Sequence, residues 1–124
     1  MLKNIACTVC QVGGEPLDSE QINQLISEIP AWSLISENGE DKLTRTFSFK
    51  DFRSALAFTQ RVGDLAEAHD HHPTIVTEWG KATVIWWTHK INGLHQNDFI
   101  MAAKTDQMYA HNFPEGDKPS NIPE

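Results

Sequence analysis

The chain has 124 residues, of which 40% are apolar, and it holds four tryptophans, which is enough material for one domain with a substantial core. Its formal net charge is −7 and its ten lysines and arginines are scattered, which argues against direct nucleic-acid binding because phosphate contacts need clustered basic side chains. No segment has the roughly twenty unbroken apolar residues of a membrane helix, and the first residues lack a secretory pattern, so we expect a cytoplasmic protein without membrane contact.

Residues 1–17 show no periodic pattern and are expected to form a flexible arm. Cys7 and Cys10 give this arm a C-x-x-C spacing. A zinc site would need about four ligands, and a thioredoxin-like motif would lie between a strand and a helix; neither context is present. We therefore expect two reduced thiols, and the sequence does not assign them a role.

A first helix is predicted after this arm. Asp18 or Ser19 can cap its start, and apolar side chains recur at helical spacing as far as Ile29. The proline that follows ends the helix.

A β-hairpin is predicted next, from alternating side chains in residues 32–36 and 42–49. Asn38 and Gly39 between the two segments are a strong turn signal. Arg45 interrupts the apolar row of the second segment. We expect it to lie near an edge of the sheet or to pair with an acidic side chain.

A long amphipathic helix follows this hairpin, with apolar side chains at the i, i+3, i+4 spacing. Asp51 is placed to cap it, and the pattern fades around His69 to His71. Pro73 forbids its continuation and keeps His72 out of helical geometry.

A second hairpin is predicted from residues 74–78 and 81–89, joined by a turn at Trp79 and Gly80. The second segment is rich in threonine, valine, isoleucine and tryptophan, which favour strands. It places a tryptophan on each of its faces. We interpret one face as core and the other as a subunit contact, consistent with a homodimer or homotetramer.

The last predicted element is a helix from Asp98 to Tyr109, and the proline-rich residues 112–124 are expected to be a disordered tail. The element order is then α-β-β-α-β-β-α over one domain, residues 18–111. Hairpin strands pair antiparallel, and helices with one apolar stripe cover one face of the sheet. We therefore predict an α+β two-layer sandwich, with a four-stranded antiparallel sheet and its helices packed on one face.

The candidate functional residues surround the second hairpin: Glu67, His71, His72, His89 and Asp98. The histidine pair lies where a helix ends and a strand begins, so both rings leave the chain where a cavity can open. Imidazoles exchange protons near neutral pH because their ordinary pKa is about 6.5. Such a cluster can supply both an acid and a base in one reaction.

Two other interpretations of this cluster compete with catalysis. Zinc would accept several imidazoles and a carboxylate, but H-x-H spacing is productive mainly on a strand, and no H-E-x-x-H signature is present. A structural cluster in an interaction protein is the second alternative, and spacing alone does not distinguish it. His69, His95 and His111 receive no role, because isolated histidines are more often structural.

Whole segments of the chain closely resemble the pterin-4a-carbinolamine dehydratase family. The resemblance covers roughly residues 18–110 and includes an acid, three residues, His-His-Pro, an aromatic residue, a second histidine and an aspartate. The segments that carry it are Phe49-Lys50-Asp51-Phe52, Arg61-Val62, Ala66-Glu67, His71-His72-Pro73, Trp79, Val84, Thr88-His89, Gly93-Leu94 and Asp98.

The resemblance implies dehydration of 4a-hydroxytetrahydrobiopterin to quinonoid dihydropterin, which recycles the pterin cofactor of aromatic amino acid hydroxylases. It implies no metal, no bound cofactor and a dimeric or tetrameric assembly. His71 and His89 fall on its catalytic positions. Its substrate-contacting and supporting positions are occupied by His72, Glu67, Asp98 and Trp32.

Three points stay open at this level. Animal members of the family also act as dimerisation cofactors of a transcription factor, so a non-catalytic scaffolding protein of the same fold is the alternative function. The residues do not decide which histidine is the acid and which the base. His95 stands where relatives more often have a hydroxyl residue, which leaves the cap of the last helix, and with it the placement of Asp98, in question.

Overall fold

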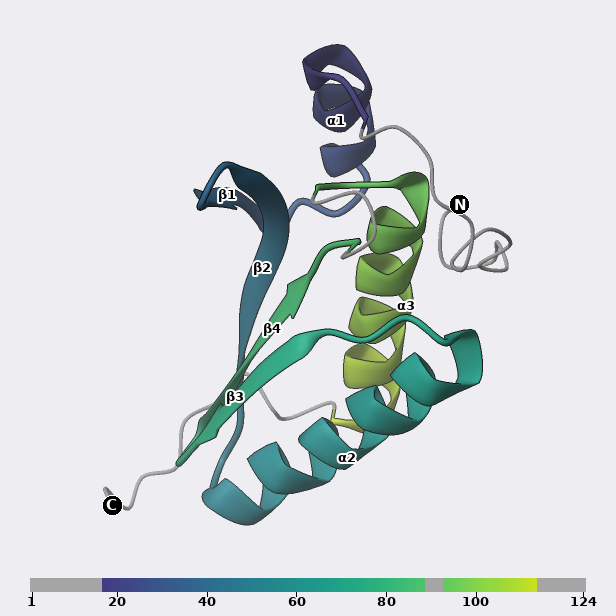
Figure 1. Cartoon of the computed structure of the whole chain (residues 1–124). Coiled ribbons are helices and arrows are strands. Elements are labelled where there is room, and N and C mark those ends of the chain that lie inside the picture. The colour runs from purple at the N-terminus through teal and green to yellow at the C-terminus, as the bar shows by residue number, and fades with distance from the viewer. Residues whose placement is uncertain (1–16, 89–92, 114–124) are drawn as a thin grey trace.

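The computed structural model describes residues 17–88 and 93–113. The helices and strands follow the predicted order (Figure 1). Their bounds are α1 Ser19–Ile26, β1 Ser33–Glu37, β2 Glu40–Ser48, α2 Phe52–His69, β3 Thr74–Glu78, β4 Lys81–Trp86 and α3 Gln96–Asn112.

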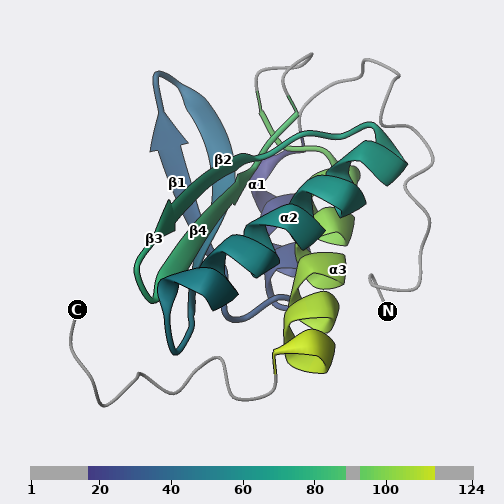
Figure 2. The same ribbon diagram turned by 90° about the horizontal axis from the view of Figure 1, so that it is seen from below.

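The strands form one antiparallel sheet in the order β1-β2-β4-β3, so that each hairpin supplies one edge strand. Helices α2 and α3 cover the same face of this sheet, and α1 packs against α3 (Figures 1 and 2). The predicted α+β two-layer sandwich is thus confirmed, with its helices on one side of the four strands.

The core lies between the sheet and the two long helices. Leu43 of β2 stands opposite Trp86 of β4, and both are fully buried. Phe58 of α2 packs against Phe47 and Phe49, with ring centroids 4.7 and 5.0 Å apart. Aromatic rings bury large apolar areas, so this cluster joins both layers.

The start and end of α2 are set by two aspartates. The Asp51 side chain accepts a hydrogen bond from the Ser54 N–H, and this bond lowers the pKa of Asp51. Asp70 ends the helix in the left-handed conformation, with φ of 51°. The chain therefore turns sharply immediately before His71, which places the histidine pair outside the helix as predicted.

Helix α1 ends earlier than the sequence pattern predicts. It stops at Ile26, and the N–H groups of Glu28 and Ile29 bond to carbonyls three residues earlier in tighter turns. The residue before a proline avoids helical geometry, which explains why the chain leaves the helix before Pro30. Ile29 is still buried, so its apolar side chain fits the helical spacing because it packs in the core and not because it belongs to the helix.

The C-terminal helix extends beyond its expected limits. It begins at Gln96 and runs to Asn112, and Phe113 packs against Phe49 and Phe58. The folded part therefore continues two residues past the expected boundary at residue 111. The expected N-terminal arm up to residue 16 and the tail from residue 114 lie outside the described residues. Within residues 17–88 and 93–113, no helix is long and apolar enough to cross a bilayer.

Candidate active site

A buried histidine–aspartate pair lies between the end of α2 and the start of α3. The Nε2 atom of His71 is 2.6 Å from the Oδ1 atom of Asp98. The His71 side chain is 5% exposed and that of Asp98 is fully buried. The structure thus brings together two predicted site residues that are 27 positions apart in the sequence.

The backbone and a tryptophan ring both fix the orientation of His71. Its N–H donates to the carbonyl of Ala66 in the last turn of α2. Its imidazole stacks on Trp86 of β4, with ring centroids 5.7 Å apart and an interplanar angle of 24°. The ring is therefore held on its face by the sheet and at Nε2 by the helix α3.

The second oxygen of Asp98 is also fully engaged. Oδ2 accepts hydrogen bonds from the Thr88 hydroxyl at 2.7 Å and from the backbone N–H of His95 at 2.9 Å. A buried carboxylate is costly unless it is hydrogen-bonded, and three donors satisfy this one. The aspartate is consequently a rigid acceptor for the imidazole.

This geometry selects one tautomer of the neutral His71 ring. A carboxylate can only accept, so the proton of the neutral imidazole lies on Nε2, which faces Asp98. Nδ1 then keeps its lone pair, and it is the ring atom available to take a proton from a bound molecule.

The neighbouring histidine lies in a different environment. His72 Nε2 is 3.0 Å from Glu67 Oε2, but these side chains are 54% and 77% exposed. The two predicted residues therefore do meet, as an exposed pair beside the buried one. Adjacent positions thus supply one buried imidazole and one that solvent and solutes can reach.

Trp32 belongs to another cluster. Its indole N–H donates to Asp106 Oδ1 at 2.8 Å, and an Arg45 guanidinium nitrogen binds the same oxygen at 2.6 Å. Burial raises the pKa of Asp106, against the lowering effect of Trp32 and Arg45. Asp106 lies eight residues beyond Asp98 on α3, about 12 Å along the helix axis. The predicted acidic partner of Arg45 is thus found, whereas Trp32 contacts this cluster instead of the histidine–aspartate pair.

The other predicted catalytic histidine, His89, falls outside the described residues. The backbone of Thr88 exchanges hydrogen bonds with that of Gly93 on either side of this segment. Among residues 17–88 and 93–113, no group of three or more histidine, cysteine, aspartate or glutamate side chains could hold a metal ion.

His95, for which no catalytic or binding role was predicted, takes part in this site as the cap residue of α3. Its Nδ1 atom accepts a hydrogen bond from the N–H of Asn97, so the imidazole caps α3. The Asp98 carboxylate bonds back to the N–H of His95, which completes a reciprocal cap. The signal in the sequence is the spacing of three residues between His95 and an acid at a predicted helix start.

The fold and the buried pair define a class of protein: a small α+β domain with a buried imidazole that is held by a carboxylate. The family described as "Pterin 4 alpha carbinolamine dehydratase" matches residues 15–108 of this chain. The chain therefore belongs to the pterin 4 alpha carbinolamine dehydratase family.

Individual relatives agree with this family. A protein from Chlorobium limicola is 55% identical over 108 residues, which cover 87% of this chain and 96% of the relative. A protein from Chlorobaculum tepidum is 52% identical over 107 residues, covering 86% and 96%. Both are named as proposed pterin-4-alpha-carbinolamine dehydratases. A solved structure described as a transcriptional coactivator/pterin dehydratase from Brucella melitensis is 30% identical, with a TM-score of 0.68 over 76% of this chain and 98% of the other.

Proposed function

We propose that the chain dehydrates 4a-hydroxytetrahydrobiopterin to quinonoid dihydropterin by histidine acid–base catalysis. The observation that carries this proposal is the buried His71–Asp98 pair, which leaves one ring nitrogen free to exchange a proton. Family membership supplies the substrate class. Aromatic amino acid hydroxylases convert their tetrahydropterin cofactor into the carbinolamine, so removal of water from that carbinolamine is one step in recycling the cofactor.

The reaction needs two proton transfers and no electron transfer. The bond between C4a and the hydroxyl oxygen breaks, and a proton from an acid turns the departing hydroxyl into water. A base removes a proton from a ring nitrogen, whose electrons form the new carbon–nitrogen double bond. His71 and His89 in opposite protonation states balance these steps, and each positioned group contributes about 10²- to 10⁴-fold.

The remaining predicted residues receive binding roles in this proposal. The exposed His72 and Glu67 contact the pterin beside the buried pair. Asp98 holds His71, as its contact distance supports. The expected contribution of Trp32 to the pterin site stays a prediction, because its indole N–H binds Asp106 and not the histidine–aspartate pair.

A stopped-flow assay of quinonoid dihydropterin formation tests the proposal. We expect His71→Ala and His89→Ala each to lose at least about tenfold in rate while remaining folded, the low end of an acid–base contribution. His111→Ala, an exposed histidine near the end of α3, is the matched control and should keep the wild-type rate. A wild-type protein that does not accelerate the reaction contradicts the enzyme and favours the scaffolding alternative.

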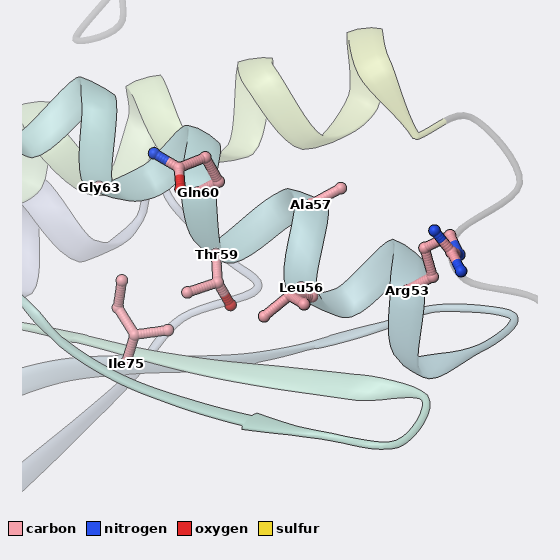
Figure 3. A pocket seen from close by; sticks show the side chains of 7 residues that line it. All are labelled: Arg53, Leu56, Ala57, Thr59, Gln60, Gly63 and Ile75. Atoms are coloured by element: carbon pink, nitrogen blue, oxygen red, sulfur yellow. The ribbon is translucent and has the colours of Figure 1, made fainter.

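The assembly of the chain is proposed from the surface formed by α2 and β3. β3 is an edge strand, and Val76 at its centre is 45% exposed. Beside it an apolar groove runs along α2, where Leu56 is 51% exposed (Figure 3). The groove is lined by Arg53, Leu56, Ala57, Thr59, Gln60, Gly63 and Ile75.

A second copy of the chain is the occupant that fits this surface. An edge strand offers unpaired backbone groups, and two antiparallel copies of β3 centred on Val76 place Thr74 opposite Glu78, with no like charges facing. The same two-fold axis brings the groove of each copy next to the other, as an isologous interface requires. We therefore propose a homodimer, or a tetramer that contains it.

Sedimentation equilibrium tests this assembly. The wild type should sediment as a dimer or larger, and Leu56→Glu should be monomeric, because burying an unpaired carboxylate is unfavourable. Leu34→Glu changes a leucine of similar exposure, 43%, on the opposite edge strand and should leave the mass unchanged. A monomeric wild type, or a Leu56→Glu variant with wild-type mass, contradicts the proposed interface.

A further inference from the structure

The carboxylate of Asp98 is held from both sides, and only one of its oxygens contacts the catalytic imidazole. Oδ1 contacts His71, whereas Oδ2 receives the Thr88 hydroxyl and the His95 N–H. A carboxylate with one donor can rotate about its terminal bond. With Oδ2 bound by two donors from different segments, Oδ1 has a single position.

Thr88 connects this carboxylate to the end of the sheet. The residue is 7% exposed, and its N–H donates to the Gly93 carbonyl at 2.8 Å. The hydroxyl that binds Asp98 therefore projects from backbone that is itself hydrogen-bonded. The contact has the short distance expected of a hydroxyl bound to a carboxylate.

His95 acts through the start of α3. Its N–H can point at Asp98 only while the residue keeps the extended cap conformation, φ −123° and ψ 162°. The bond from the Asn97 N–H to the His95 Nδ1 atom, at 3.1 Å, stabilises that conformation. An imidazole thus does here what a hydroxyl or amide side chain does at most helix starts.

We propose that Thr88 and His95 are positioning residues, which orient Asp98 so that it fixes the Nε2–H tautomer of His71 and leaves Nδ1 free for the substrate. This inference rests on the proposed function for its kinetic consequence. Its structural half concerns the protein without substrate and can be tested separately.

The first measurement is the NMR signal of the His71 Nε2 proton in the substrate-free protein. A short bond to a carboxylate moves such a proton far downfield. We expect Thr88→Val to move this signal upfield, because the carboxylate loses its hydroxyl donor and can rotate. Thr88→Ser keeps a hydroxyl and should restore the signal. Thr46→Val removes a hydroxyl from a threonine pair on the exposed face of the sheet and is the matched control.

The second measurement is the rate of dehydration by the same variants. Because Thr88 acts through Asp98 rather than on the substrate, Thr88→Val should lower kcat about tenfold, a barrier change of about 1.4 kcal/mol, and leave KM unchanged. Thr88→Ser should recover most of the loss. Thermal unfolding confirms that each variant is folded under the assay conditions.

Two substitutions of His95 test whether its capping bond is what positions Asp98. His95→Asn retains a cap acceptor and should keep both the His71 proton signal and kcat. His95→Leu has no cap acceptor, so its proton signal should move upfield and its kcat should fall. A folded Thr88→Val or His95→Leu protein with the wild-type signal and kcat overturns the inference. A wild type without dehydratase activity, whose His71 signal still moves in Thr88→Val, refutes the proposed function but supports the positioning.

Discussion

Neighbouring histidines acquire different properties from one backbone turn. The left-handed Asp70 ends α2, so that His71 is directed into the layer between sheet and α3 while His72 remains exposed. An exposed contact such as that between His72 and Glu67 contributes at most about 1 kcal/mol to stability. Removing one partner of a buried pair leaves the other unsatisfied and costs more. Substitutions at these two adjacent positions should therefore differ in stability as well as in activity.

His69 gives a residue-scale prediction of pH dependence. It is the last residue of α2, where a helix end favours a charged histidine. Burial nevertheless lowers its pKa below 6.5, with further lowering by Lys104 and His71. The unfolded chain then binds the proton more readily than the native state. His69 thus contributes stability above pH 6.5 that is lost as the pH falls through its lowered pKa.

Urea unfolding of His69→Gln at one pH above and one below this range tests the sign. The variant should lose less unfolding free energy on acidification than the wild type does. His111→Gln, at an exposed site in the last turn of α3, should behave like the wild type. An equal loss in His69→Gln and wild type would show that burial does not control this group.

At the scale of elements, the sequence correctly predicted the turns and helix ends that depend only on residues close together in the chain. The turn at Asn38 and Gly39, the cap at Asp51 and the breaking of α2 before Pro73 each depend on residues within a few positions, and all are found. The end of α1 differs from its predicted position. Ile29 is buried in the core outside the helix, and the spacing of apolar residues does not distinguish core packing from helix formation.

The candidate site was predicted as a set of residues rather than as a geometry. The contact between His71 and Asp98 depends on how α3 crosses the end of the sheet, which no local spacing encodes. The cap of the last helix stayed in question because His95 replaces a more usual hydroxyl residue there, although its spacing to Asp98 matches the reciprocal cap that the structure shows. The pairing of Trp32 with Asp106 likewise joins residues 74 positions apart.

The first hairpin gives an element-scale prediction. Asn38 and Gly39 have φ of 53° and 81°, the pair of positive values that a two-residue hairpin turn requires. A Cβ at Gly39 would meet nothing within 4 Å, so the cost of a side chain there is purely one of backbone conformation. We expect Gly39→Ala to destabilise the protein by about 1 to 2 kcal/mol.

Urea unfolding measures this cost, and two variants make it specific. Gly39→Asn should lose less stability than Gly39→Ala, because asparagine tolerates the left-handed region better than alanine does. Ser36→Ala, an exposed position on β1 of the same hairpin, should change the free energy of unfolding by less than about 0.5 kcal/mol. Equal stability of Gly39→Ala and wild type would show that the turn is not conformationally demanding.

At the scale of the whole molecule, one carboxylate joins three parts of the fold. Asp106 of α3 binds Arg45 of β2 and the Trp32 indole that precedes β1. The Arg45 guanidinium also lies over the Phe47 ring, 4.2 Å from its centroid. Because Arg45 interrupts an apolar row, the sequence predicted either a place near an edge of the sheet or an acidic partner. The structure shows the acidic partner, and its identity depends on how helix and sheet pack.

The last prediction concerns this junction. Asp106→Ala leaves a half-buried guanidinium and an indole N–H without their shared acceptor, so the free energy of unfolding should fall by about 2 kcal/mol, the size of a hydrogen bond to a charged group. Asp106→Asn keeps an acceptor oxygen at the same place, so its free energy of unfolding should fall less than that of Asp106→Ala. Asp64→Ala, which removes a carboxylate bound to Gln60 on the exposed surface of α2, should change stability by less than about 0.5 kcal/mol.

The pH dependence of the same variants identifies which force dominates at Asp106. Because burial raises its pKa above 3.8, outweighing Trp32 and Arg45, the native state holds this proton more tightly than the unfolded chain does. Its contribution is greatest below pH 3.8 and is lost as the pH rises through the raised pKa. The stability advantage of the wild type over Asp106→Asn should therefore shrink on raising the pH across that window. An advantage that grows instead would mean that the attraction to Arg45 outweighs the cost of burying the charge.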